Sequence, residues 1–202
     1  MNSEPTLKVS EIFYSLQGEG GRAGRPSIFI RLQGCKAKHA CAAMGIKCDT
    51  EFESGAEISI YGLHLKISKY EGKEIVWTGG EPTDQLTEEV VIFFKSKGYY
   101  QAIETSGLNP APPGLDYICV SPKVAEHIVK KNFPDGVDEL RYVRHAGQEI
   151  PQPQTTAIRY FLSPHFDGYN INDENLKHCI TLCLQNPSWN LSVQSHKLWN
   201  VL

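Results

Sequence analysis

The fold of this 202-residue chain is decided by residues 74–107, EIVWTGGEPTDQLTEEVVIFFKSKGYYQAIETSG. Two short runs within it, Glu74–Thr78 and Tyr100–Glu104, are rich in β-branched and aromatic residues, which is typical of strands. Between them, Gln85–Lys97 has the apolar spacing of an amphipathic helix. A strand, a helix and a second strand in this order predict two parallel strands with the helix across one face.

The same alternation continues on both sides of this unit. Two further helices are predicted at Glu57–Lys69 and Asn172–Gln185. The other predicted strands are Val9–Ser15, Ser27–Gln33, Asp116–Ser121, Glu139–Val143, Ala157–Ser163 and Asn190–Gln194. These few helices do not suffice for a complete eight-fold barrel, which needs ~250 residues. We therefore predict an α/β fold, an incomplete TIM-like barrel of parallel strands with few covering helices, in one domain over residues 1–202.

The composition is that of an ordinary globular protein with a small excess of acidic residues. Hydrophobic residues make up 41% and charged residues 21%, and the formal net charge is −3. Such a charge gives no general attraction to nucleic acid or to an anionic membrane. No apolar run approaches the ~20 residues of a membrane helix, and the amino-terminal sequence has no secretion signal. We therefore expect a cytoplasmic protein with neither nucleic acid nor a membrane as its partner.

Residues that are unusual for a core directly follow five of the predicted strands. They are Gly34-Cys35, Gly79-Gly80-Glu81-Pro82, Glu104-Thr105-Ser106-Gly107, Ser121-Pro122-Lys123 and Gln194-Ser195-His196-Lys197. In α/β folds the loops after parallel strands converge at one edge, where the chemistry collects. Taken alone, the Gly-Gly segment fits a tight strand-to-helix turn equally well. Five such segments together predict one functional site at this edge.

The six cysteines fall into two groups. Cys119 lies in a predicted strand, and Cys179 and Cys183 lie four residues apart on a predicted helix, so we expect these three to pack in the core. The other three are surrounded by polar, Lys-rich and Ala-rich sequence, and a reducing cytoplasm favours metal or cluster ligation over disulfides. They are Cys35, Cys41 and Cys48.

Three thiolates in one loop can bind zinc, bind an iron–sulfur cluster or hold no ligand. A structural zinc site uses four ligands, usually paired two to four residues apart. Here five residues separate Cys35 from Cys41 and six separate Cys41 from Cys48, and His39 is the nearby fourth candidate. A [4Fe–4S] cluster with three cysteine ligands leaves one iron open to a small chelating molecule. Exposed thiols without a ligand are easily oxidised, so the cluster is the favoured interpretation.

The ordered set of motifs resembles the radical S-adenosylmethionine superfamily and, more closely, the 7-carboxy-7-deazaguanine synthase family. The segments that carry this resemblance are residues 11–20 (EIFYSLQGEG), 24–26 (GRP), 31–35 (RLQGC), 48–50 (CDT), 78–82 (TGGEP), 104–105 (ET), 121–123 (SPK) and 194–197 (QSHK). Two features depart from the superfamily's pattern. Its cysteines are usually three and two residues apart, although longer insertions occur within the synthase family, and the residue before the last cysteine is often aromatic but is Lys47 here.

The resemblance implies that Cys35, Cys41 and Cys48 bind three irons of a [4Fe–4S] cluster, whose fourth iron is chelated by S-adenosylmethionine. Electron transfer would then break a carbon–sulfur bond and give a 5′-deoxyadenosyl radical, which requires a closed, dry site. The residues implied in S-adenosylmethionine binding are Lys47, Asp49, Gly80, Ser121, Pro122, Lys123, Ser163, Pro164, His165 and Phe166.

The resemblance also implies a reaction, the conversion of 6-carboxy-5,6,7,8-tetrahydropterin to 7-carboxy-7-deazaguanine with loss of ammonia. Glu19 would meet the guanidine-like face of the pterin and Arg31 its carboxylate. Mg²⁺ would be held by Thr50 together with the substrate carboxylate. The full set implied in substrate binding is Leu16, Gln17, Gly18, Glu19, Arg31, Thr78 and Leu202.

For partners, the resemblance implies an electron donor such as flavodoxin or ferredoxin, and a second copy of the chain in a homodimer. Two other functions stay open. A radical-activating enzyme would take hydrogen from a glycine of a partner protein, but residues 16–19 and Arg31 suit a small polar substrate better. A zinc-stabilised binding module without catalysis would leave residues 79–81 and 121–123 unexplained.

Overall fold

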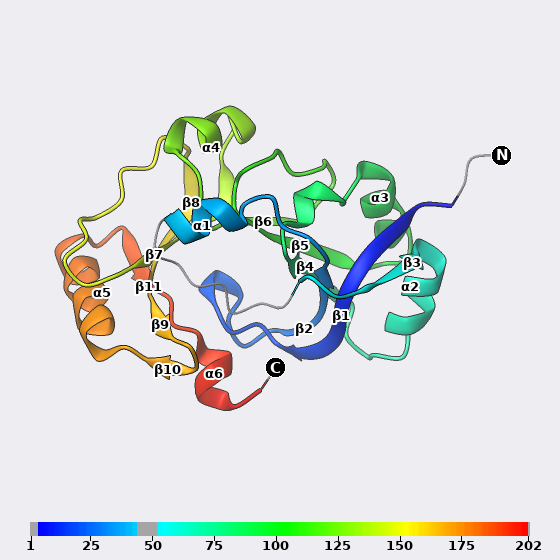
Figure 1. Cartoon of the computed structure of the whole chain (residues 1–202), viewed down its shortest axis with the longest axis horizontal. Helices are drawn as coiled ribbons and strands as arrows, with labels where there is room; N and C mark the ends of the chain where they lie inside the picture. Colours follow the sequence, from blue (N-terminus) through cyan, green and yellow to red (C-terminus); the bar gives the residue numbers. More distant parts are fainter. Residues whose placement is uncertain (1–3, 44–51, 202) are drawn as a thin grey trace.

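The computed structural model describes residues 4–43 and 52–201. Its elements are drawn in Figure 1 and run along the chain as follows: β1 Thr6–Leu16, η1 Gly20–Arg22, β2 Pro26–Leu32, α1 Lys38–Ala43, β3 Ala56–Ser59, α2 Ile60–Ile67, β4 Glu74–Gly79, η2 Pro82–Asp84, α3 Glu88–Ser96, β5 Tyr100–Thr105, β6 Tyr117–Val120, α4 Glu126–Asn132, β7 Val137–Arg144, β8 Ala157–Pro164, β9 Phe166–Asp167, β10 Asn170–Ile171, α5 Asp173–Gln185, β11 Trp189–Leu191 and α6 Ser195–Trp199. No helix in these described ranges is long and apolar enough to cross a membrane.

One large sheet organises the molecule. Its strands lie in the order β11-β8-β7-β6-β5-β4-β2-β1-β3. The pairs from β2 to β11 are parallel, whereas β1 pairs antiparallel with both β2 and β3. In the described part of the chain β3 and β11 do not pair, so the sheet stays open. The prediction of an incomplete barrel is therefore confirmed.

The apolar core fills the space between the sheet and its covering helices. Figure 1 shows α2, α3, α4 and α5 around the outer edge of the molecule, with α1 over the middle. Ile30 of β2 and Trp77 of β4 are fully buried against Leu63 of α2 and Phe94 of α3. A second cluster, which includes Leu140 of β7, packs under α4 and α5. Burial on this face is the main apolar contribution to stability.

Because side chains alternate along a strand, the remaining residues face the inside of the open barrel. Near β1 and β2 this inner face is still apolar, since Phe13 and Phe29 stack with their ring centroids 4.9 Å apart. Farther along, the inner face carries Glu104 at the end of β5, Cys119 of β6, and Glu139 and Arg141 of β7. The functional candidates therefore lie inside the barrel, opposite the helix-covered core.

The loop between β1 and β2 covers the amino-terminal ends of the central strands. Its two arms are joined by the Gln17 N–H, which donates to the Arg25 carbonyl at 2.9 Å. The buried Arg22 side chain of this loop pairs with Glu74 at the start of β4, with 2.6 Å between Nη2 and Oε2, and lies 4.9 Å from the Tyr100 ring centroid. This pairing holds the loop, residues 17–25, beneath the barrel interior, and we call it the floor loop.

Two predicted elements differ from the structure. The predicted helix Glu57–Lys69 begins as strand β3, because residues 56–59 pair with the start of β1, and the helix starts only at Ile60. The Ser59 side chain accepts a hydrogen bond from the Gly62 N–H and so caps this later start. The predicted strand Asn190–Gln194 is wrong in its bounds, since β11 is Trp189–Leu191. The strand ends early because the chain then turns to the β1–β2 loop, where the Ser195 N–H donates to the Gly18 carbonyl at 3.0 Å and α6 begins.

Candidate active site

The cysteine loop begins where β2 ends. Cys35 follows the strand, and Cys41 lies in α1, where its N–H donates to the Ala37 carbonyl at 3.1 Å. Both cysteines are partly buried. Several residues predicted for the cluster, S-adenosylmethionine, magnesium or substrate lie outside the described residues: Lys47, Cys48, Asp49, Thr50 and Leu202.

Two glycines bring the end of β4 into contact with the cysteine loop. Gly79 has φ +110°, a backbone conformation that L side chains rarely adopt. A Cβ on Gly80 would lie 1.7 Å from the Gly34 carbonyl oxygen and 3.2 Å from the Cys35 Cβ. The Gly80 N–H donates to the Leu32 carbonyl at 2.9 Å. The Gly-Gly segment therefore permits a backbone approach that another residue would block.

Glu81 joins the ends of β4 and β5. Its carboxylate is 1% exposed and accepts hydrogen bonds from the Thr105 hydroxyl at 2.7 Å and from the Ser106 N–H at 2.9 Å. It also accepts from the Thr83 hydroxyl at 2.7 Å and from the Ser106 hydroxyl. A buried carboxylate with this many donors orders the loops around it.

Lys123 and Ser121 meet directly after β6. The Lys123 ammonium donates to the Ser121 hydroxyl at 2.7 Å and to the Ser121 carbonyl at 3.0 Å. Burial lowers the pKa of Lys123, and the neighbouring Cys41 opposes this shift. Lys123 lies directly after β6, at the carboxyl edge of the sheet where the cysteine loop also follows its strand.

A cavity of about 160 Å³ lies beside Lys123, at the carboxyl end of β7. Its lining comprises Pro122, Lys123, Tyr142, Val143, Arg144, His145 and Gln148. His165, which follows β8, stacks on His145 with ring centroids 4.3 Å apart. Ser163 and Phe166 are buried, and the Ser163 hydroxyl donates to the Ser192 carbonyl at 2.8 Å. The structure thus brings the 121–123 and 163–166 segments to one place.

The predicted substrate residues of the β1–β2 loop reach into the barrel from its floor. Gln17 is 7% exposed, and its amide nitrogen donates to Glu104 at 3.0 Å while its amide oxygen accepts from the Gly18 N–H at 2.8 Å. A Cβ on Gly18 would lie 2.1 Å from His196 Nδ1. The carboxy-terminal segment therefore packs directly on this loop.

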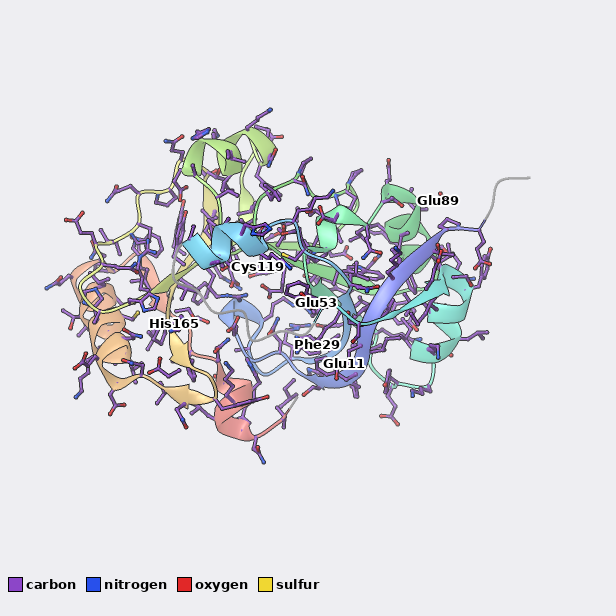
Figure 2. The ribbon with its side chains drawn as sticks, in the orientation of Figure 1. Glu11, Phe29, Glu53, Glu89, Cys119 and His165 are labelled. Carbon is purple, nitrogen blue, oxygen red and sulfur yellow. The ribbon has the colours of Figure 1, made fainter. Side chains whose placement is uncertain are left out.

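Arg31 lies on the inner face of β2, as its alternation with buried Ile30 and Leu32 predicts. Its Nε lies 3.0 Å from Glu11 Oε2, and its guanidinium lies 5.1 Å from the Phe13 ring centroid. Thr78 is its register partner on the neighbouring strand β4. Figure 2 labels Glu11 and Phe29 on this side of the molecule, His165 on the other side and Cys119 between them.

A buried cluster of charged side chains occupies the middle of the barrel. Arg141 of β7 pairs with Glu139 Oε1 at 2.9 Å, with Glu19 Oε2 at 3.1 Å and with Glu104. Arg141 is 5% exposed and Glu139 is 1% exposed. Burial is the largest influence on Glu104 and raises its pKa, whereas Arg141 lowers it.

Sequence reasoning assigned no role to Glu139 or Arg141 and placed Glu104 only in a motif. The signal that could have found them is their alternation with apolar residues. Glu139 and Arg141 alternate with Leu140 and Tyr142 inside a predicted strand, which places both charges on the face away from the helices. Buried charges on that face indicate a binding or catalytic site.

Cys35 and Cys41 supply two of the three thiolates predicted for the cluster, and the third, Cys48, lies outside the described residues. Within residues 4–43 and 52–201 no group of three His, Cys, Asp or Glu side chains could hold a metal ion. The cysteine loop contacts Gly80, a residue predicted to hold S-adenosylmethionine. The chemistry of these donors therefore fits a thiolate-bound cluster with a chelating ligand at its side.

The core predictions for the other described cysteines are confirmed. Cys119 and Cys179 are buried, and Cys183 packs partly buried against the second core cluster.

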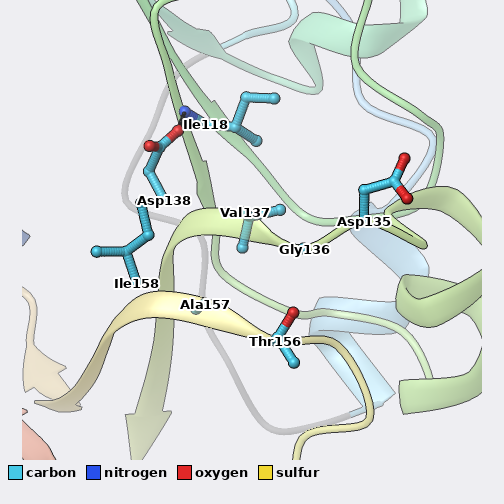
Figure 3. A pocket seen from close by; sticks show the side chains of 8 residues that line it. All are labelled: Ile118, Asp135, Gly136, Val137, Asp138, Thr156, Ala157 and Ile158. Atoms are coloured by element: carbon cyan, nitrogen blue, oxygen red, sulfur yellow. Dashed lines mark hydrogen bonds between the residues drawn. The ribbon is translucent and has the colours of Figure 1, made fainter.

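A larger cavity lies at the opposite edge of the sheet, away from all of these motifs. It has a volume of about 390 Å³ and is formed around the amino ends of β6, β7 and β8 (Figure 3). Asp138, in its wall, accepts a hydrogen bond from the Ile118 N–H at 2.8 Å. Since ligands of α/β folds bind at the carboxyl edge, this cavity is not the candidate active site.

No family model matches the chain. It is 37% identical over 212 residues to the 7-carboxy-7-deazaguanine synthase of Haemophilus influenzae, covering 96% of this chain and 94% of that protein. The chain belongs to the 7-carboxy-7-deazaguanine synthase family. It is also 34% identical over 195 residues to the 7-carboxy-7-deazaguanine synthase of Bacteroides thetaiotaomicron, covering 96% of this chain and 98% of that protein. The crystal structure of QueE from Escherichia coli has the same fold, with a TM-score of 0.70, 22% identity and 95% of each chain covered.

Proposed function

We propose that this chain converts 6-carboxy-5,6,7,8-tetrahydropterin to 7-carboxy-7-deazaguanine with release of ammonia, in 7-deazapurine (queuosine) biosynthesis. Family membership supports the reaction. The observation that carries the proposal is the contact of Gly80 with Gly34 and Cys35, because it joins the cysteine loop to a proposed cofactor loop. The charged cluster around Arg141 lies deeper in the same open barrel.

In this proposal Cys35, Cys41 and Cys48 hold a [4Fe–4S] cluster. When bound, the cluster and S-adenosylmethionine supply a carbon radical that removes a hydrogen atom from the substrate. The Gly80 N–H is already bonded to Leu32, so its carbonyl is the group available to the methionine amine. Lys123, held by Ser121, serves the ribose or the carboxylate.

The remaining proposed contacts of S-adenosylmethionine surround the cavity beside Lys123. Pro122 lines this cavity, and His165 stacks on its wall residue His145. The segment of Ser163, Pro164, His165 and Phe166 then runs along the adenine. Lys47 and Asp49 complete the set proposed from the sequence.

The substrate binds inside the barrel, above the floor made by the β1–β2 loop. Leu16, Gln17 and Gly18 contact the edge of the pterin, and Glu19 accepts from its guanidine-like N–H groups. Arg31 binds the substrate carboxylate. The other proposed substrate contacts are Thr78 and Leu202.

The proposal extends to the partners of the reaction. Thr50 and the substrate carboxylate bind Mg²⁺, whose preference is for oxygen ligands. A flavodoxin or ferredoxin supplies the electron. The chain, folded as one domain over residues 1–202, acts as a homodimer in the cytoplasm.

The test is an anaerobic assay of the reconstituted protein with carboxytetrahydropterin, S-adenosylmethionine and a reductant. We expect the deazapurine product, 5′-deoxyadenosine formation and bound iron and sulfide. The variants Cys35→Ala, Cys41→Ala and Cys48→Ala should lose both the cluster and the product. Production of 5′-deoxyadenosine without deazapurine would instead favour a radical-activating enzyme. One bound zinc with no sulfide would favour a zinc-stabilised binding module.

A further inference from the structure

The charged cluster inside the barrel is arranged around a single guanidinium. Arg141 contacts three carboxylates that come from three separate parts of the chain. Glu139 lies on its own strand, Glu104 ends the neighbouring β5, and Glu19 belongs to the floor loop. Arg141 is therefore the one residue in the described cluster that contacts all three carboxylates.

The three carboxylates are not equivalent. Glu139 accepts from the Gly21 N–H at 2.9 Å and from the Tyr117 hydroxyl at 2.8 Å, in addition to Arg141 Nη1 at 2.9 Å. The Cys119 thiol also donates to it at 3.4 Å. A carboxylate surrounded by four donors has little capacity left for a ligand. Glu139 thus acts as the anchor that fixes the Arg141 side chain.

Glu19 and Glu104 share the other end of the guanidinium. Both contact Arg141 Nη2, Glu19 at 3.1 Å. Glu104 also accepts a hydrogen bond from Gln17 at 3.0 Å, and hydrogen bonding by the Cys119 thiol lowers the pKa of Glu104. No partner is found for Glu19 Oε1 among the described residues. These two carboxylates are held side by side by one shared donor group and keep acceptor capacity toward the barrel interior.

The charge of the cluster is unbalanced. Its three carboxylates pair with one guanidinium, and a further cation whose charge reaches Glu19 is Lys123. Tyr117, Cys119 and Gln17 contribute neutral donors. Arg31 pairs with Glu11 on β1 instead. Like charges held together in a buried place favour a ligand that brings N–H donors or positive charge. The aminopyrimidinone edge of a pterin has this character.

We propose that Arg141 is a positioning residue that sets the spacing of the Glu19 and Glu104 carboxylates, so that together they accept the N–H edge of the substrate. This inference rests on the proposed function and deepens it. Arg141 itself need not touch the substrate, because both of its terminal nitrogens already pair with carboxylates. Lysine keeps the charge at this position but lacks the planar fork that joins separate carboxylates.

The test uses the cluster-loaded protein and three variants: Arg141→Met, Arg141→Lys and the double variant Glu139→Gln with Arg141→Met. The double variant removes both members of the buried pair and so guards against loss of folding caused by an unpaired Glu139. Lys95→Met is the matched control, since Lys95 pairs with Asp116 on the exposed outer surface. Each protein is assayed for KM and kcat, and for the Kd of the oxidised analogue 6-carboxypterin by fluorescence.

We expect KM and the Kd of 6-carboxypterin to rise by about 10- to 100-fold in both methionine variants, because charge-assisted contacts are misplaced. In Arg141→Lys both KM and the Kd of 6-carboxypterin should lie between those of the wild type and the methionine variants. Arg141 opposes the rise in the pKa of Glu104, so Arg141→Met should raise this pKa further. The acid limb of the pH profile of kcat/KM should therefore move to higher pH in this variant. Besides Arg141, the groups facing Glu104 are Glu139, Cys119 and Glu19, with Gln17 bonded to it.

Folded methionine variants that bind 6-carboxypterin as tightly as the wild type would overturn the inference, as would an unmoved acid limb. A lysine variant no better than the methionine variant would overturn the role of the planar fork. Failure of the proposed function is distinguishable, because it is seen as a wild type that forms no deazapurine. The Kd series still decides the role of Arg141 in that case.

Discussion

The contact between Gly80 and the cysteine loop gives a sharp test of how the active site is assembled. In Gly80→Ala the new Cβ would lie 1.7 Å from the Gly34 carbonyl oxygen. No real contact is this short. The Cβ position is fixed by the backbone of residue 80 and the Gly34 oxygen is itself a backbone atom, so neither atom can rotate away. The two segments are also joined by the Glu81 N–H, which donates to the Gly34 carbonyl at 2.9 Å. The alanine must therefore separate the end of β4 from the cysteine loop.

The free-energy cost of separating β4 from the cysteine loop follows from the hydrogen bonds that the separation breaks. Two backbone hydrogen bonds, from Gly80 to Leu32 and from Glu81 to Gly34, are lost or lengthened at about 1 kcal/mol each. Residual overpacking adds about 1 kcal/mol or more. A total of about 3 kcal/mol lowers Tm by roughly 6–12 °C for a chain of this length.

The assay combines thermal unfolding of the metal-free protein with iron and sulfide analysis after anaerobic reconstitution. Gly62→Ala is the matched control, because Gly62 lies in α2 and its added Cβ would meet the Ser59 Oγ at 3.3 Å. Alanine is favoured over glycine in a helix, so the control should keep the wild-type Tm and cluster content. A Gly80→Ala protein with an unchanged Tm and a full cluster would refute the reasoning.

Three further predictions concern stability, thiol reactivity and the cysteine loop. The hydrogen bond with Arg25 lowers the pKa of Glu74. The ionised Glu74 carboxylate therefore stabilises the fold above about pH 4.5, and this stabilisation is lost as the pH falls further. Urea unfolding between pH 3 and 7 should show Glu74→Gln to be less stable than the wild type only at the higher pH values. Burial raises the pKa of Cys179 to about 12. Iodoacetamide at pH 8 should therefore leave this thiol unmodified in the folded protein and alkylate it in urea, as measured by mass spectrometry. Alkylation of Cys179 without urea would contradict its burial. Ala42→Pro removes a backbone hydrogen bond inside α1 and should lower the iron and sulfide content after reconstitution. Lys38→Pro places proline at the first helical position, where it is tolerated, and should keep the wild-type content. Equal iron content in the two variants would contradict a role for α1 in holding the cluster.

The parallel strands were predictable because each is a short apolar run that a local pattern identifies. In β4, Ile75, Val76 and Trp77 are all fully buried, since the strand is covered on both faces. The glycine and lysine motifs were predictable for a related reason, namely that the ends of such strands meet at one edge. Residues 79–80 indeed approach the cysteine loop there, and Lys123 follows β6 at the same edge.

Other features depend on contacts that no local pattern contains. The strand character of residues 56–59 comes from pairing with Thr6–Val9, some fifty residues earlier in the chain. The helical periodicity of the whole 57–69 segment concealed this pairing. Arg141 is another example, because its role follows from carboxylates at Glu19 and Glu104 that only the folded sheet brings together.

The longer cysteine spacing of this chain has a structural explanation. Six residue steps from Cys35 to Cys41 would span about 20 Å in an extended chain. Helix α1 begins at Lys38, and a helix rises only about 1.5 Å per residue. The turn that starts it is closed by the Cys41 N–H, which donates to the Ala37 carbonyl. The residues between Cys35 and Cys41 are therefore taken up in part by a helical turn, which keeps the two cysteines closer together than an extended chain would.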